Sequence, residues 1–89
     1  MSKIVATMKI FPENIIKDFS NVKKAITKML PKEASVYKFE EEPIAFGLIT
    51  LIVHVVLPES TNGVLEKIER AIKNLEDVSE VEVVLTRRI

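Results

Sequence analysis

The sequence predicts an α+β fold in which a four-stranded antiparallel sheet carries two helices on one face. Three observations predict it: four short segments are typical of strands, either alternating apolar and polar residues or almost continuously apolar, two segments repeat apolar residues at helical spacing, and the segments follow one another as β-α-β-β-α-β. The chain has 89 residues, of which 47% are apolar and 29% charged. This length and composition suit one domain spanning residues 1–89.

The first strand is predicted from Ile4 to Ile10, where apolar and polar residues alternate. Pro12 ends it, because proline supplies no N–H to a sheet ladder. A helix follows and stops at Pro31. Its apolar residues recur at three- and four-residue steps and predict the stripe that packs on the sheet: Ile15 or Ile16, Phe19, Val22, Ile26, Met29 and Leu30.

Two further strands are predicted on either side of a loop. Residues 35–40 alternate again and carry charge at their end, as suits a strand at a sheet edge. Residues 41–47 contain proline and glycine and predict the loop. Residues 48–57 are almost continuously apolar or β-branched, which is typical of a strand buried on both faces and hence central in its sheet.

A second helix and a last strand complete the chain. Ser60 or Thr61 can cap the helix, since a hydroxyl accepts hydrogen bonds from its first N–H groups. The predicted core stripe of this helix is Val64, Leu65, Ile68, Ala71, Ile72 and Leu75. Residues 78–85 predict the last strand, and residues 87–89 a tail that is expected to fray.

The economical arrangement of these elements places both amphipathic helices on the same side of the sheet. This is the split β-α-β, or ferredoxin-like, fold. Right-handed crossovers then put the first and third strands side by side at the centre. The second apolar face of the third strand points away from the helices and must be covered by long side chains, a second copy or a partner. Its residues are Leu48, Ile52 and Val56.

The charge balance excludes some functions and leaves others open. Thirteen basic and thirteen acidic side chains cancel, which argues against generic nucleic-acid binding. Residues 1–32 carry a net charge of +5 and residues 33–89 one of −5. This asymmetry either steers a partner or merely sorts charges between faces. The absence of cysteine excludes thiolate metal sites and fits a cytoplasmic protein, and no apolar run is long enough to span a bilayer.

The sequence offers no set of residues for bond-making chemistry, and we expect neither a catalytic residue nor a bound metal or cofactor. His54 is the only histidine and lies within a strand, where a structural role is expected. Glu40–Glu42 is interpreted as a solvated strand end, with a partner contact or a weak cation site as the alternative. Two glycines are too few for a phosphate-binding loop. The third strand lacks the aromatic residues on which an RNA-recognition sheet stacks bases.

Two features suggest contacts with another molecule. Phe46 lies in the loop between proline and glycine, where it either anchors an interface or folds back to cap the core. Arg87 and Arg88 place two cations at the end of the last strand, where they serve either binding or solubility.

The segment Glu41-Glu42-Pro43-Ile44-Ala45-Phe46-Gly47-Leu48, followed by a long apolar strand, closely resembles the archaeal elongation factor 1-beta family. The opening residues 4–13 and the closing Arg87-Arg88 support this resemblance, which runs over essentially the whole chain. The chain is also similar to the C-terminal exchange domain of eukaryotic elongation factor 1-beta. The resemblance implies a guanine-nucleotide exchange factor that speeds GDP release from elongation factor 1-alpha, the GTPase that brings aminoacyl-tRNA to the ribosome.

The resemblance also implies a set of contact residues. In the eukaryotic relatives a penultimate lysine reaches toward the Mg²⁺ site of the GTPase. Here the matching residue is Arg88, whose planar and permanently charged group is not equivalent to lysine, and Arg87 could share the role. Phe46 matches an aromatic residue of the family's loop. The implied contacts with elongation factor 1-alpha are Pro43, Ile44, Phe46, Gly47, Arg87, Arg88 and Ile89. No direct contact with nucleic acid or membrane is implied.

The alternative functions use the same topology. One is a small-molecule-sensing module, which ligand-dependent stabilisation would reveal. The other is an RNA- or ribosome-binding domain, which salt-dependent RNA affinity would reveal.

Overall fold

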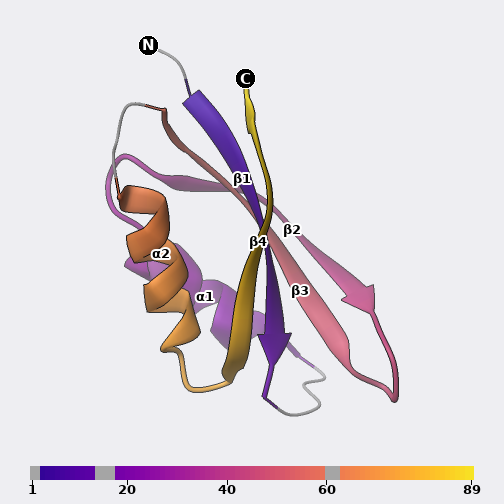
Figure 1. Ribbon diagram of the computed structural model, residues 1–89. Coiled ribbons are helices and arrows are strands. Elements are labelled where there is room, and N and C mark those ends of the chain that lie inside the picture. The colour runs from indigo at the N-terminus through magenta and orange to yellow at the C-terminus, as the bar shows by residue number, and fades with distance from the viewer. Residues whose placement is uncertain (1–2, 14–17, 60–62) are drawn as a thin grey trace.

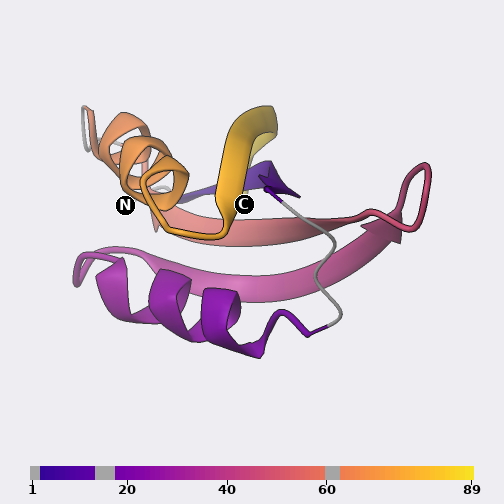
Figure 2. The same ribbon diagram turned by 90° about the horizontal axis from the view of Figure 1, so that it is seen from below.

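The structure, a computed structural model, describes residues 3–13, 18–59 and 63–89. It confirms the order β-α-β-β-α-β and the ferredoxin-like arrangement (Figure 1). The elements are β1 (Lys3–Pro12), α1 (Ser20–Met29), β2 (Ser35–Pro43), β3 (Ile49–Pro58), α2 (Val64–Lys73) and β4 (Val78–Arg88). The strands form one antiparallel sheet in the order β2-β3-β1-β4, so β1 and β3 are central as predicted. Both helices lie on the same side of it (Figure 1), and Figure 2 shows the same arrangement from below.

The core lies between this sheet and the helices, and strand alternation builds it. Every second residue of β1 and β3 turns toward the helices and is buried, whereas the residues between them face the open side of the sheet. The residues that the two central strands bury there are Ala6, Met8, Ile10, Leu51, Val53, Val55 and Leu57. The residues that the helices bury against the sheet are Val22, Ile26, Ile68 and Ile72.

The helices differ from prediction in detail. Ala71 is exposed, so its place in the predicted stripe of α2 is wrong. Phe19 is buried as predicted, but it precedes α1, whose first N–H groups begin beside Asp18: this carboxylate accepts hydrogen bonds from the Ser20 backbone N–H (2.9 Å) and hydroxyl (2.6 Å). Ile15 and Ile16 lie outside the described residues.

The capping prediction for α2 is not tested by the described residues. The residue before its first turn is Gly63, which adopts a left-handed φ of 78° and supplies no side-chain cap. Ser60 and Thr61 lie outside the described residues.

Two strands are longer than predicted. β2 continues to Pro43, so residues 41–43 belong to the strand and not to the loop. β4 continues to Arg88, and the backbone N–H of Ile89 donates to the carbonyl of Lys3 at 3.0 Å. The expected frayed tail is therefore wrong, because the chain end is tied to β1.

The second face of β3 is less buried than predicted. Thr50 is fully buried there, but Ile52, His54 and Val56 are half-buried. Both described helices lie on the other side of the sheet, so this face is open. The described part of the chain contains no helix that is long and apolar enough to cross a membrane.

Candidate partner-binding surfaces

The loop between β2 and β3 is a tight turn that presents Phe46 at its tip. The N–H of Leu48 donates to the carbonyl of Ala45 at 3.1 Å, and the two residues between them have φ values of 57° (Phe46) and 78° (Gly47). Positive φ at both central positions defines a type I′ turn, which suits the twist of a hairpin. A second hydrogen bond, from the N–H of Ile44 to the carbonyl of Leu48 at 2.9 Å, joins the strand ends.

Phe46 is an unfavourable residue for this turn. Asparagine or glycine is preferred where φ is positive, and a bulky residue is strained there. The ring is also 94% exposed, so it buries almost nothing in compensation. The alternative that Phe46 caps the core is therefore wrong. In the isolated chain Phe46 is strained by its positive φ and exposes its ring to water. Such an aromatic side chain is a candidate for binding a partner.

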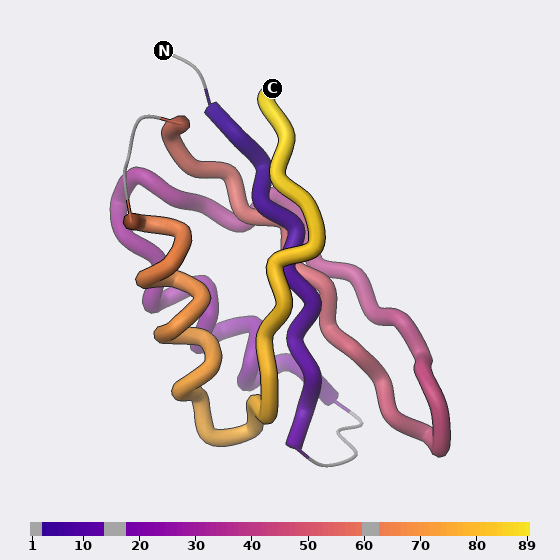
Figure 3. Tube along the Cα trace, viewed as in Figure 1, coloured from indigo at the N-terminus to yellow at the C-terminus, as the bar shows by residue number. Residues whose placement is uncertain are grey.

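The neighbours of Phe46 share its exposure. Ile44 is 46% exposed, and Pro43 and Gly47 are exposed as well. Pro43 ends β2 opposite Ile49, and its missing N–H is tolerated because β2 is an edge strand. The four residues predicted for this loop thus lie together, on a hairpin that extends beyond the helices (Figure 3).

The other predicted residues lie at the opposite end of the sheet. Arg87 pairs with Val5 and Arg88 with Ile4 in the β1–β4 ladder. The guanidinium of Arg88 also contacts Glu59, just after β3, at 2.7 Å, although its side chain is 78% exposed. Ile89 is 67% exposed. Strand pairing and one ion pair therefore hold the chain end, while the charged group remains accessible.

The structure does not bring the two groups of predicted residues together. The turn follows Pro43 and precedes Ile49, whereas Arg88 lies beside the end of β3 at Pro58. Ten residues of β3 span about 30 Å. The longest dimension of the molecule is 42 Å, and Figure 1 shows the C-terminus and the β2–β3 turn at opposite ends. One flat ligand of small size cannot touch both groups.

A hydrogen-bonded chain crosses the open face between these ends. His54 Nε2 lies 3.0 Å from Glu40 Oε2, and His54 Nδ1 lies 2.8 Å from the Thr7 hydroxyl. Because a carboxylate only accepts, Nε2–H donates to Glu40; in the neutral ring Nδ1 then accepts from Thr7. The bond from His54, followed by Lys38, lowers the pKa of Glu40. The predicted structural role of His54 is thus a link between β1, β3 and β2.

The acidic run 40–42 is exposed, and each carboxylate has a cation of this chain beside it. Glu40 also meets Lys38 at 3.1 Å, and Glu41 meets Lys23 of α1 at 3.6 Å. Glu42 meets Lys9 at 3.2 Å. No group of three metal-ligating side chains is found among the described residues.

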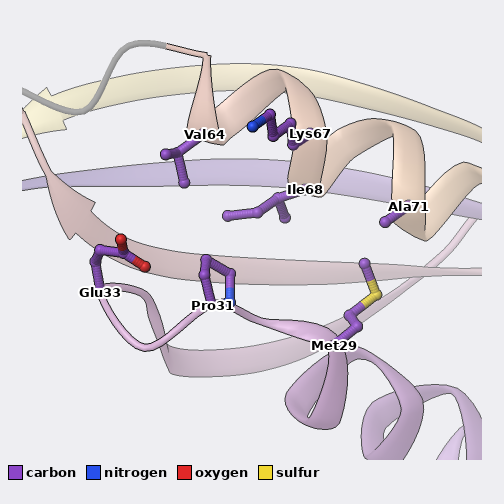
Figure 4. A pocket seen from close by; sticks show the side chains of 7 residues that line it. All are labelled: Met29, Pro31, Glu33, Val64, Lys67, Ile68 and Ala71. Atoms are coloured by element: carbon purple, nitrogen blue, oxygen red, sulfur yellow. The ribbon is translucent and has the colours of Figure 1, made fainter.

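A shallow groove of about 360 Å³ lies between α2 and the end of α1 (Figure 4). Its floor is apolar, with Met29, Pro31, Val64 and Ile68, and Glu33 and Lys67 stand at its rim. None of the residues that line the groove is among those predicted for binding.

Sequence patterns did not predict two residues that bond to Arg88 and His54. Glu59 follows the proline that ends β3 and gives no signal of its own, since its contact with Arg88 depends on the strand order. Thr7 is one of several strand hydroxyls, and only the register Thr7 to His54 reveals its role.

Comparisons with known proteins identify the family of this chain. The EF-1 guanine nucleotide exchange domain family matches residues 5–89. Elongation factor 1-beta of Staphylothermus marinus is 39% identical over 100% of this chain and 99% of its own. That of Methanobrevibacter smithii is 43% identical over the same shares, and that of Saccharolobus solfataricus 37% identical over 100% and 98%. The chain belongs to the EF-1 guanine nucleotide exchange domain family, and so to the exchange factors of translation elongation.

The fold also recurs in a more distant protein. The solution structure of the C-terminal domain of the MgtC protein from Mycobacterium tuberculosis superimposes with a TM-score of 0.64, covering 100% of this chain and 88% of that one. The two share 16% identity, so this likeness concerns the fold alone.

Proposed function

We propose that residues 1–89 form one exchange domain that binds elongation factor 1-alpha and speeds the release of GDP from it. The observation that carries the proposal is the match of residues 5–89 to an exchange domain, together with 39% identity to an elongation factor 1-beta over the whole chain. The proposed reaction makes and breaks no covalent bond, so it needs contact residues and no acid–base groups.

The mechanism follows from differential affinity. A GTPase holds GDP through its phosphate loop and through Mg²⁺, which neutralises phosphate charge. An exchange factor accelerates release by binding the nucleotide-poor state better than the loaded one, and only by that difference. Arg88 supplies a cation that competes with Mg²⁺ for its ligands. The ion pair with Glu59 orients this cation at the end of the sheet. Phe46, about 30 Å away along the sheet, fills an apolar contact elsewhere on the GTPase.

The deciding experiment measures release of a fluorescent GDP analogue from elongation factor 1-alpha in excess unlabelled nucleotide. We expect substoichiometric amounts of this chain to accelerate release. A folded chain that leaves the rate of an active GTPase unchanged would overturn the proposal, and the screens for small ligands and RNA would follow.

A further inference from the structure

The outer edge of β4 is open along its second half. β4 is the last strand of the sheet, and α2 lies beside only its first half (Figures 1 and 3). Residues 84–89 are all exposed, with Val84 at 48% and Leu85 at 54%. A long unpaired edge is a template for another strand, and natural proteins usually guard it.

In the first half of this edge, side chains cover the backbone of the strand. The backbone N–H of Val81 donates to the Glu80 carboxylate at 3.2 Å, and Lys73 of α2 lies 3.2 Å from the same oxygen. Among the described residues, no side chain hydrogen-bonds to the backbone of the second half. Because this N–H bonds to a side chain, Val81 turns its N–H away from β1.

The outward backbone groups of the second half follow from the ladder. The bond from Ile89 to Lys3 marks a hydrogen-bonded pair, and such pairs alternate with non-bonded ones along antiparallel strands. The β4 residues opposite Ile4, Ala6, Met8 and Ile10 therefore direct their N–H and C=O groups outward. These residues are Arg88, Thr86, Val83 and Val81. For Val81 this outward direction agrees with the hydrogen bond from its N–H to the Glu80 carboxylate.

The side chains of β4 sort just as clearly. The register places Leu85 opposite Thr7, Arg87 opposite Val5 and Glu82 opposite Lys9, all on the open face. A bulge between the partners of Thr7 and Met8 leaves Val84 as the extra residue, and the side chains of a bulge pair lie on the same face.

We infer that the second half of β4 pairs with β4 of a second copy of this chain, antiparallel, with Val84 opposite Leu85 of that copy. This register sets Val83 opposite Thr86, and both turn their backbone groups outward. It also sets Glu82 opposite Arg87, and both lie on the open face. A register shifted by one residue would set inward groups against outward ones and place side chains on opposite faces.

Charge complementarity favours a second copy as the occupant. Glu82 and Arg87 have no ion-pair partner in the described part of the chain. The twofold symmetry of the pairing forms two Glu82–Arg87 contacts, on either side of a Val84–Leu85 centre. The paired segment is short compared with the roughly 20–30 residues a side of a standard interface, so the dimer is weak and depends on concentration.

The test is a sedimentation series from about 10 μM to about 1 mM, the range of weak association. We expect the mean mass of the wild type to rise toward two chains. Arg87→Glu should weaken association by about 10-fold or more, because it sets like charges opposite each other twice. Glu82→Arg combined with Arg87→Glu restores both pairs at unchanged net charge, and should recover association to within about threefold of the wild type.

A backbone variant tests the same edge independently. Thr86→Pro removes an outward N–H and should abolish association, whereas Thr86→Val keeps the N–H and should preserve it. Circular dichroism verifies that each variant is folded. A wild type that stays monomeric throughout, a charge-swapped double variant that associates no better than Arg87→Glu, or a Thr86→Pro variant that associates like the wild type would each overturn the inference.

Discussion

The two ends of the sheet hold their candidate contacts in different ways. At the β2–β3 end, four neighbouring residues and two turn hydrogen bonds present Phe46, so the presentation is local. At the other end, Arg88 depends on pairing with β1 and on Glu59, which is 29 positions earlier in the sequence. A local device tolerates changes elsewhere in the fold, whereas the second one needs the whole sheet. Substitutions can separate the two.

The largest effect is expected at Arg88. Arg88→Ala should slow GDP release by about 100-fold, which corresponds to about 2.7 kcal/mol of lost stabilisation of the nucleotide-poor state, while binding to GDP-loaded elongation factor 1-alpha weakens less. Stopped-flow release at saturating and subsaturating chain separates rate from affinity. Arg87→Ala is the matched control, and an equal loss there would mean that the two cations act as a unit.

Phe46 should affect affinity more than rate. Phe46→Ala removes an exposed aromatic contact and should weaken association by about 30-fold, as for a typical hot-spot residue. Phe46→Asn should weaken association similarly but raise the free energy of unfolding by about 1 kcal/mol, because asparagine accepts positive φ. Titration calorimetry and thermal unfolding measure the two effects. A destabilised Phe46→Asn variant would contradict the strained turn.

Glu59 tests the long-range device by itself. Glu59→Gln should reduce the exchange rate by about two- to fivefold with little change in stability, since exposed ion pairs contribute at most about 1 kcal/mol. The same substitution in the Arg88→Ala background should have no further effect, because Glu59 acts through Arg88. An additive loss in the double variant would assign Glu59 a separate role.

The smallest effect concerns the span between the two ends. Hydrogen bonds from His54 and Lys38 hold the pKa of Glu40 below its ordinary 4.5. A carboxyl group whose folded pKa is lowered stabilises the fold above the unfolded pKa, and this contribution is lost as the pH falls through the folded value. The melting temperature should therefore fall less steeply between pH 7 and about pH 3 for Glu40→Gln than for the wild type. Equal slopes in both proteins would contradict the pairing with His54.

Local sequence was enough to predict the element order and most of the buried stripes, although not the exposure of Ala71, because alternation and helical spacing are set by neighbouring residues. It also placed Phe46 in a loop beside Gly47. It could not decide whether that ring was buried, since the outcome depends on a positive φ that phenylalanine disfavours. It missed the extent of β4, because only pairing with β1 keeps Arg88 in a strand.

The contacts that join distant segments were beyond sequence reasoning. Thr7 and His54 are 47 positions apart, and their hydrogen bond requires the register between β1 and β3. The outward groups of β4 likewise follow from one hydrogen bond and a bulge that no local pattern announces.

The uninterrupted length of β3 makes the sheet a strut of fixed length and fixed rotation. Two modest contacts joined by a stiff strut engage one partner with a high effective concentration, but only when the partner's sites match its span. Adding one residue to each arm of the β2–β3 hairpin would move the tip by about 3.4 Å and turn it to the opposite face. The spacing of the two ends is thereby written into the number of residues in a single strand.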